Sequence, residues 1–267
     1  MAMLRRGQVL QHGTRRDLRF RVLGRLGEGG FGEAYEIVCL SENDQEFGDT
    51  RCLKVTTDDW SWHGETYFMR LLRGDAHAVQ LYDSFPMQVG EGEAKRTRFC
   101  LLMELLKDRS VSDLCDSGEL PWSEDRVVRQ LRYLLRTLGR LHELQTPHRD
   151  ITPTNTYVGN RSALKLGDYG IAATAKLHKG VRADAFNPAF CPPDLKTFWD
   201  RRDDVYQVGL LALTLLSGKV HCAGVKKPAV NALTKKDGVL RDVIKGALGV
   251  KAQRYAHAGA MRAALEA

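Results

Sequence analysis

The chain lacks an apolar run long enough to cross a membrane as a helix, which takes roughly 18 residues or more. Its longest clear apolar stretch, residues 208–216, is interrupted by Gly209 and Thr214. The first 20 residues carry positive charge, but they lack the apolar core and the small-residue cleavage site of a secretory signal. We therefore expect a cytoplasmic protein with no membrane partner.

Cysteines are few and show no paired spacing. The six of them contain no CxxC pair, so neither a zinc site nor a disulfide framework is predicted. We expect buried and reduced thiols. The six residues are Cys39, Cys52, Cys100, Cys115, Cys191 and Cys222.

The composition excludes intrinsic disorder and fibrous repeats. Apolar residues make up 43% of the chain and charged residues 27%, which is ordinary for a globular protein. The net charge of +7 favours phosphate-bearing ligands. Because the basic residues are spread along the chain rather than clustered, no nucleic-acid partner is expected.

The first part of the chain is predicted to form mainly β-strands. Short runs of β-branched and aromatic residues between positions 19 and 100 are separated by turn residues. One helix interrupts them, in which Glu65 shares a face with Phe68, Met69 and Leu72. A carboxylate on the buried face of a helix needs a cationic partner.

After Leu106 the sequence becomes helical. Ser123 is predicted to cap a helix whose apolar residues recur at helical spacing between Val127 and Leu141. A β-rich part followed by an α-rich part predicts two lobes with a cleft between them, where ligands usually bind.

A glycine-rich motif lies between two strand-like segments. Residues 27–32, Gly-Glu-Gly-Gly-Phe-Gly, match the pattern GxGxxG. In a dinucleotide-binding fold a helix follows the third glycine, whereas here a strand continues, so a hairpin folded over phosphates is predicted. Glycines also serve ordinary tight turns, so this motif alone does not decide the function.

Lys54 lies in a short strand, on the same face as Cys52, and Glu65 follows eleven positions later. A lysine–glutamate pair of this kind can hold the α- and β-phosphates of a nucleotide. An exposed surface lysine is the alternative interpretation, because lysine side chains are mostly exposed.

Two further motifs carry oxygen ligands. Residues 148–155, His-Arg-Asp-Ile-Thr-Pro-Thr-Asn, place Asp150 and Asn155 five positions apart. Asp150 can orient an attacking hydroxyl, and Asn155 can ligate a metal ion bound to phosphate oxygens. Asp168 follows in an Asp-Tyr-Gly motif at the end of a strand and adds a carboxylate of the kind that Mg²⁺ requires.

In this order, the motifs resemble those of a eukaryotic-type serine/threonine protein kinase domain, of the kind also found in bacteria. The resemblance covers about residues 19–264. It implies a two-lobed α+β protein kinase fold that forms a single domain over residues 1–267. The N-lobe, rich in β-structure with one main helix, would span about residues 1–105, the hinge about 103–107, and the mostly helical C-lobe about 107–267.

The resemblance also implies an activity. The chain would bind ATP and Mg²⁺, with Mn²⁺ as an alternative, and transfer the γ-phosphoryl group to Ser or Thr hydroxyls of an unknown protein substrate, including its own. Asp150 would be the catalytic base, Lys54 would contact phosphates and pair with Glu65, and Asn155 and Asp168 would hold the metal ion. The implied ATP-binding residues are Gly27, Glu28, Gly29, Gly30, Phe31, Gly32, Ala34, Cys52, Lys54, Met103, Glu104 and Leu106.

Three residues of the C-terminal half match structural positions of the family. Asp204 stands near the start of a long buried helix, where the family has an aspartate that caps the backbone of the catalytic loop. Asp194 stands where the family usually has a glutamate, and Arg254 stands at the place of its buried partner. The resemblance therefore implies an Asp194–Arg254 ion pair, in which the aspartate side chain is one methylene shorter than the usual glutamate.

Two departures fall beside the implied catalytic base. Thr152 stands where serine/threonine kinases usually carry a lysine, and Asn187 stands where a threonine normally contacts that lysine. We expect Thr152 and Asn187 to form a substitute hydrogen-bonded pair that orients Asp150. The loss of a preorganised charge can lower the rate by about 10²–10³, so slow turnover is expected.

The segment between Asp168 and Asp194 departs as well. Arg149 precedes Asp150, which in this family often indicates an activation segment ordered by a bound phosphate. Thr174 is the only Ser or Thr in that segment, and Asp184 could supply a fixed negative charge in place of a phosphate. We expect Asp184 to have this role.

Two alternative functions remain. A pseudokinase that binds nucleotide as a scaffold is favoured only by Thr152. A small-molecule kinase of the aminoglycoside or choline type shares the two-lobed core, but it lacks an equivalent of the Asp194–Arg254 arrangement. The sequence does not determine the oligomeric state.

Overall fold

The computed structural model describes residues 2–30, 32–41, 43–90, 95–159, 162–172, 186–196, 198–225, 227–235 and 238–267. The chain divides into two compact units. The first comprises Met1–Gly74 and Val79–Lys107, and the second comprises Asp75–Ala78 and Asp108–Ala267. Residues 75–78 thus belong with the helical unit, although they lie within the expected N-lobe.

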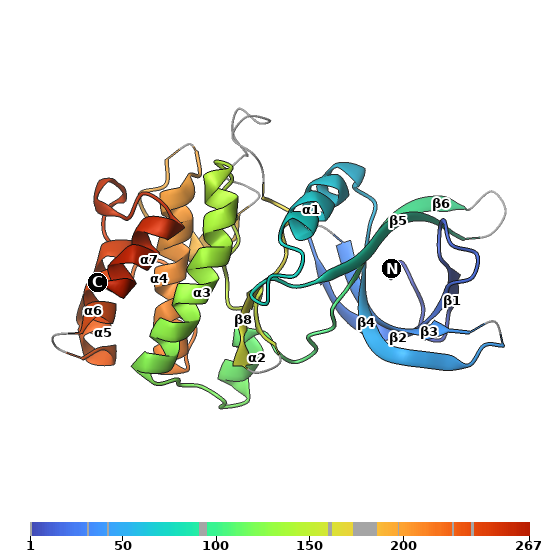
Figure 1. The fold of residues 1–267 in the computed structure, drawn as a ribbon, viewed down its shortest axis with the longest axis horizontal. Helices are drawn as coiled ribbons and strands as arrows, with labels where there is room; N and C mark the ends of the chain where they lie inside the picture. The colour runs from blue at the N-terminus through green and yellow to red at the C-terminus, as the bar shows by residue number, and fades with distance from the viewer. Residues whose placement is uncertain are drawn as a thin grey trace. The chain divides into compact units, whose positions relative to one another are not determined.

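The first unit is built on one curled antiparallel sheet, drawn in blue to green in Figure 1. Its strand order is β1-β2-β3-β4-β6-β5, so β6 lies between β4 and β5. The strands are β1 (Val9–Gln11), β2 (Arg19–Gly29), β3 (Gly32–Leu40), β4 (Glu46–Thr56), β5 (Leu81–Val89) and β6 (Arg96–Met103).

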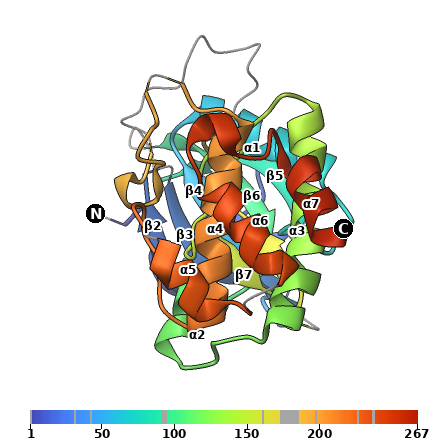
Figure 2. The ribbon, with the colours of Figure 1, turned by 90° about the vertical axis from the view of Figure 1, so that its left-hand side faces the viewer.

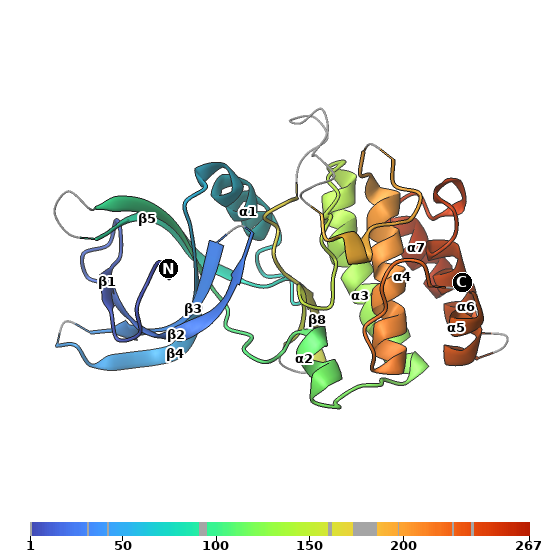
Figure 3. The same cartoon turned by 180° about the vertical axis from the view of Figure 1, so that it is seen from behind.

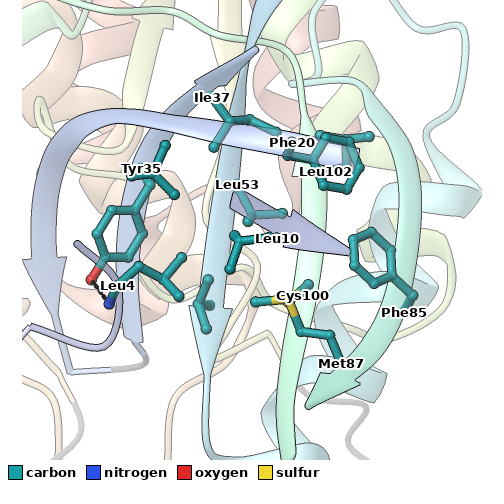
Figure 4. Close-up of a cluster of buried hydrophobic side chains, with 12 residues drawn as sticks. Leu4, Leu10, Phe20, Tyr35, Ile37, Leu53, Phe85, Met87, Cys100 and Leu102 are labelled. Carbon is teal, nitrogen blue, oxygen red and sulfur yellow. Dashed lines mark hydrogen bonds between the residues drawn. The ribbon is translucent and has the colours of Figure 1, made fainter. Parts of the chain in front are cut away.

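The concave face of this sheet encloses an apolar core, in which side chains from all six strands meet (Figure 4). Phe20 on β2 stacks on Phe85 on β5, with ring centroids 6.0 Å apart. The N-terminal segment contributes Leu4, whose backbone N–H donates a hydrogen bond of 3.0 Å to the Tyr35 hydroxyl, the dashed line in Figure 4. Burial of these side chains supplies the main driving force for the curled sheet.

One helix, α1 (Asp59–Leu71), accompanies the sheet. Asp58 caps it by accepting hydrogen bonds from the backbone N–H groups of Trp60 and Ser61, as helix N-termini require. Its buried face contains Glu65, Phe68 and Met69, so the periodicity expected from the sequence is confirmed.

The second unit is mainly helical. Its longest helix, α3 (Glu124–Glu143), is capped by Ser123, as predicted. It lies beside the buried helix α4 (Arg201–Ser217), as seen from both sides in Figures 1 and 3. The remaining elements are α2 (Val111–Asp116), β7 (Thr156–Val158), β8 (Leu164–Leu166), η4 (Pro188–Phe190), α5 (Lys227–Leu233), α6 (Val239–Ala247), η5 (Lys251–Gln253) and α7 (Ala258–Glu266).

Helix α4 is buried on every side from Asp203 to Leu216, which explains why its sequence shows no polar face. It begins at Arg201, capped by Asp200, so Asp204 lies in its first turn. Within the described part of the chain, no helix combines the length and the apolar composition needed to cross a membrane.

The α+β architecture expected from the sequence is confirmed, but two of its details are new. Strand β1 and helix α2 are short and carry no strong periodicity, so they were not expected from the sequence. All six cysteines are free, yet Cys222 is exposed. Cys39, Cys115 and Cys191 are only partly buried, so the expectation of buried thiols is confirmed only for Cys52 and Cys100.

Candidate active site

The glycine-rich motif forms the turn of the β2–β3 hairpin, in which Gly29 pairs with Gly32 and Gly27 with Ala34. Gly32 has a φ of +134°, and a Cβ there would lie 2.3 Å from the carbonyl oxygen of Val55, so only glycine fits. A Cβ at Gly27, Gly29 or Gly30 would meet nothing within 4 Å. The chain's own packing therefore does not require these three glycines, which suits a backbone left open for a ligand. Phe31 lies outside the described residues.

Lys54 and Glu65 form the expected ion pair. The Lys54 Nζ donates hydrogen bonds of 2.8 and 3.0 Å to the two carboxylate oxygens of Glu65. The side chains are 11% and 3% exposed, respectively, so strand β4 and helix α1 are joined by a largely dehydrated pair. The interpretation of Lys54 as an ordinary surface lysine is wrong.

Three of the other residues implied to bind ATP share one face of the sheet with Lys54. Ala34 on β3 pairs with Lys54, and Cys52 on β4 pairs with Met103 on β6. Because paired residues point to the same face and the side chains alternate along each strand, Ala34, Cys52, Lys54 and Met103 line one surface. The opposite face carries the apolar core.

The hinge residues continue directly from β6. The Glu104 backbone N–H donates to the carbonyl oxygen of Gln80 at 2.9 Å, and the Glu104 carboxylate accepts from the Gln80 N–H at 3.3 Å. These bonds fix the backbone just beyond Met103. Leu106 is half-buried, and Lys107 ends the first unit.

In the second unit, the backbone of the His-Arg-Asp motif is hydrogen-bonded to side chains of helix α4. Asp204 accepts hydrogen bonds from the backbone N–H groups of His148 at 2.6 Å and Arg149 at 2.9 Å. Gln207, one turn further along, accepts from the Ile151 N–H at 2.8 Å. The implied role of Asp204 as a cap for this loop is thereby confirmed.

Asp204 has two further partners that the sequence did not indicate. His142 on α3 donates to it from Nε2 at 2.9 Å, and Trp199 donates from Nε1 at 2.8 Å. Burial alone would raise the pKa of Asp204, but the hydrogen bond from His142 and the donors around it outweigh burial and lower that pKa. The carboxylate therefore stays ionised in a fully buried site.

The implied base Asp150 and the implied metal ligand Asn155 are in direct contact. Asn155 donates from Nδ2 to Asp150 Oδ2 at 2.5 Å, and its backbone carbonyl accepts from the Gly167 N–H at 3.0 Å. Asp168 follows with a φ of +56°, and its carboxylate accepts from the Gly170 N–H at 3.2 Å. The backbone contact at Gly167 thus ties Asn155 to the segment that carries Asp168.

This donor set fits a hard divalent cation. The Asn155 Oδ1 makes no hydrogen bond with any described residue, because the amide directs its N–H toward Asp150. Amide and carboxylate oxygens are the ligands that Mg²⁺ prefers, and Mg²⁺ usually takes its remaining ligands from phosphates and water. In the described ranges no group of three or more His, Cys, Asp or Glu side chains is arranged so that it could hold a metal ion.

Tyr169, in the Asp-Tyr-Gly motif, is fully buried. Its hydroxyl donates to the carbonyl oxygen of Leu166 at 3.0 Å, and its ring packs 5.0 Å from that of His148. The buried Tyr169 hydroxyl therefore has the hydrogen-bond partner that a buried polar group needs. Burial also lowers the pKa of His148, which favours a neutral imidazole at this position.

The expectation of a hydrogen bond between Thr152 and Asn187 is wrong. The Thr152 side chain is buried, and its hydroxyl shares a hydrogen bond of 2.9 Å with the hydroxyl of Thr154. The Asn187 Oδ1 accepts from the Ala189 N–H at 3.1 Å and caps η4. Each side chain is satisfied by a partner two residues along the chain, so neither needs the other.

Arg149 is 4% exposed, and its Nε and Nη1 atoms have no hydrogen-bond partner among the described residues. Burial lowers the pKa of its guanidinium. Buried N–H donors that lack a partner among the described residues are costly, so this site suits an anion. Thr174 and Asp184, the two residues considered for that charge, lie outside the described residues.

The implied Asp194–Arg254 pair is present. The Arg254 Nη2 donates to Asp194 Oδ1 at 2.5 Å and Nη1 donates to Asp203 Oδ1 at 3.2 Å. Lys251 adds a second cation, since its Nζ donates to Asp203 Oδ2 at 2.6 Å. Burial raises the pKa of Asp203. Burial also acts to raise the pKa of Asp194, but the hydrogen bonds from Arg254 and from the Lys251 backbone N–H, together with the charge of Arg254, outweigh it and lower that pKa. Sequence reasoning missed Asp203 and Lys251.

Comparison with known proteins agrees with this geometry. The family model of the protein kinase domain matches residues 20–252, so the chain belongs to the protein kinase family. The expected two-lobed α+β fold class is thereby confirmed, and the family is that of protein kinases rather than of small-molecule kinases.

Several curated serine/threonine-protein kinases resemble the chain. Kinase cst-1 of Caenorhabditis elegans is 25% identical over 75% of this chain and 39% of its own length. PEPKR2 of Arabidopsis thaliana is 28% identical over 78% of this chain and 42% of its own length. PknL of Mycobacterium tuberculosis is 28% identical over 78% of this chain and 51% of its own length. The chain therefore spans about half, or less, of the length of these relatives.

Proposed function

We propose that the chain is an active serine/threonine protein kinase that transfers the γ-phosphoryl group of ATP to Ser or Thr hydroxyls of protein substrates. The observation that carries this proposal is the formed Lys54–Glu65 ion pair, which must be in place for catalysis in this family. The kinase names of the curated relatives support the choice of acceptor. We also propose that residues 1–267 act as one cytoplasmic domain.

The residues of the first unit would bind the nucleotide. The glycine hairpin would offer its backbone N–H groups to the phosphates, and Lys54, held by Glu65, would contact the α- and β-phosphates. The face that carries Ala34, Cys52 and Met103 would contact the adenine, and the backbone at Glu104 and Leu106 would border it. Glu65 acts here as a positioning residue, since it acts through Lys54.

The residues of the second unit would carry the transfer. Asp150 would accept the proton of the substrate hydroxyl while that oxygen bonds to the γ-phosphorus and the bond to the β–γ bridging oxygen breaks, which releases ADP. Asn155 and Asp168 would hold Mg²⁺, or Mn²⁺ in its place, and the cation would neutralise charge on the phosphates. The hydrogen bond from Asn155 keeps the Asp150 carboxylate in a single orientation.

Turnover should be slow, because Thr152 replaces the usual lysine and no substitute pair with Asn187 is formed. The γ-phosphate would then lack one preorganised positive charge during transfer. The same substitution is the one observation that favours the second candidate, a pseudokinase that binds ATP without transferring phosphate.

The test is transfer of labelled γ-phosphate from ATP, first with Mg²⁺ and then with Mn²⁺, to the protein itself and to a generic basic substrate. Incorporation that disappears in Asp150→Asn would support phosphoryl transfer by this site. Measurable nucleotide binding without incorporation in either protein would instead support the pseudokinase.

A further inference from the structure

A groove of about 680 Å³ runs between α3 and α7 on the helical unit. Figure 2 shows α7, in red, beside α3, in green. None of the residues assigned to ATP binding or transfer lies in it. The groove is lined by Asp125, Val128, Arg129, Arg132, Tyr133, Arg136, Arg262 and Glu266.

Arginine dominates this lining, with four arginines against two carboxylates. Arg129, Arg132 and Arg136 follow one another at spacings of three and four residues on α3, which places them on one helix face. Like charges at these spacings repel and weaken a helix. The stripe therefore does not serve the stability of α3, which points to an anionic partner outside the chain.

One of the arginines on α3 is held in place by α7, and another arginine lies on α7 itself. The Arg132 Nη2 donates to the carbonyl oxygen of Leu265 at 2.5 Å, near the end of that helix. The Arg262 Nε lies 3.7 Å from the Glu266 carboxylate and has no hydrogen-bond partner, although it is buried from solvent. The Arg132 guanidinium is thus positioned by one hydrogen bond, and a guanidinium has five N–H donors, so further donors remain for an acceptor group of a ligand.

The other two arginines are available. Arg129 and Arg136 are exposed and make no hydrogen bond or ion pair with any residue that the structure describes. The Arg136 guanidinium lies 5.4 Å from the ring centroid of Tyr133, whose side chain is 42% exposed. Cationic and aromatic surface thus lie together, a combination enriched in protein-binding sites.

We propose that this groove docks an acidic peptide segment of a partner protein. Guanidinium groups bind carboxylates with two parallel hydrogen bonds, and Tyr133 and Val128 offer apolar contact between them. Asp125 to Arg136 spans eleven positions, or about 16 Å of helix at about 1.5 Å per residue. That length accommodates about five residues of extended peptide at about 3.3 Å each.

The two carboxylates in the lining favour a peptide over a nucleic acid. Asp125 and Glu266 would repel a phosphate backbone, which carries one negative charge at every nucleotide. A peptide can avoid them, or donate its backbone N–H groups to them. This proposal does not depend on phosphoryl transfer, because docking is measured by binding alone.

The test uses fluorescence anisotropy with a labelled twelve-residue peptide of Glu with Leu at every fourth position. The charge-reversal variant is Arg129→Glu/Arg136→Glu, because neither side chain holds a structural hydrogen bond. The matched control is Arg73→Glu/Lys219→Glu, which changes the net charge equally at exposed positions outside the groove. A twelve-nucleotide single-stranded DNA is titrated in parallel.

We expect the acidic peptide to bind the wild-type chain and to lose at least about tenfold in affinity in the groove variant, with much less loss in the control. Replacement of Glu by Gln in the peptide should abolish the difference between variant and control. Equal losses in both double variants, absence of binding to the wild type, or tighter groove-dependent binding of the DNA would each overturn the proposal.

Discussion

Asp204 at the start of helix α4 accepts hydrogen bonds from both His148 and Arg149, at 2.6 and 2.9 Å, so one buried carboxylate holds the backbone that precedes the proposed base. His142 and Trp199 complete its shell. The position of Asp150 is thus set by a residue 54 positions away in the sequence. This link makes the catalytic loop part of the core of the helical unit.

Removal of the Asp204 charge should therefore destabilise the helical unit strongly. Asp204→Asn keeps the shape but directs an amide N–H₂ toward groups that are themselves donors, and we expect a loss of about 3 kcal/mol or more in the free energy of unfolding. Denaturant titration measures it. Asp116→Asn, at the exposed end of α2, is the control and should change stability by less than about 0.5 kcal/mol. A loss below about 1 kcal/mol in Asp204→Asn would contradict the proposed anchoring.

The Lys54–Glu65 pair allows stability to be separated from activity. Lys54→Met removes the cation that pairs with the buried Glu65 carboxylate and should cost about 3–5 kcal/mol, whereas Lys54→Met/Glu65→Leu should recover most of that loss. Neither variant should transfer phosphate, because Lys54 is proposed to contact ATP.

Denaturant titration and labelled-ATP incorporation give the two readouts for this pair. The control is Lys107→Met, which breaks the more exposed pair with Glu36 and should cost less than about 1 kcal/mol. If the double variant is as unstable as Lys54→Met, then the charge of Glu65 is not what destabilises the single variant.

Thr152→Lys tests the missing positive charge. We expect a rate increase of about 10²-fold, because a lysine there would place a preorganised charge beside the transferred phosphate. Steady-state transfer rates measure it, and thermal unfolding checks that the buried site tolerates the larger side chain. Ala232→Lys, at an exposed position on α5, adds the same charge away from this loop and should leave the rate unchanged. A Thr152→Lys enzyme that is stably folded but no faster would show that the charge is not limiting.

Stability should also fall as the pH decreases from about 7 toward 5. Burial lowers the pKa of His12, and the neighbouring Asp83 only partly offsets this effect; burial likewise lowers the pKa of His77 and of His148. The unfolded chain, with histidine pKa values of about 6.5, then binds protons more readily than the folded chain. Stability is complete above that pH and is lost as the pH falls below it.

His12→Asn isolates one of these contributions. The His12 Nδ1 accepts from the Thr14 and Arg15 N–H groups, and an asparagine oxygen can accept the same two bonds. Denaturant titrations at several pH values should give a shallower pH dependence than in the wild type, even if the absolute stability falls. An unchanged slope would show that His12 does not contribute to the acid sensitivity.

Much of the fold and the site could be predicted from local sequence patterns. Helical periodicity predicts which side chains face inward, and it placed Glu65 on a buried face. A buried carboxylate requires a cation, and Lys54 is that cation. The cap at Ser123 and the hairpin at residues 27–32 follow in the same way, since each depends only on neighbours along the chain. The family motifs added the Asp204 cap and the Asp194–Arg254 pair.

Other features depended on which distant segments meet. The side chains of Thr152 and Asn187 were expected to form a hydrogen bond with each other, but each is bonded to a residue two positions along the chain. A sequence motif does not show which of these competing hydrogen bonds forms. His142 and Trp199 reach Asp204, and Lys251 reaches Asp203, only because α3, α4 and η5 converge in the helical unit. The sequence by itself determined the elements and the chemistry of the proposed site. Only the tertiary structure decided the partners of its buried charges, because those depend on packing between segments far apart in the chain.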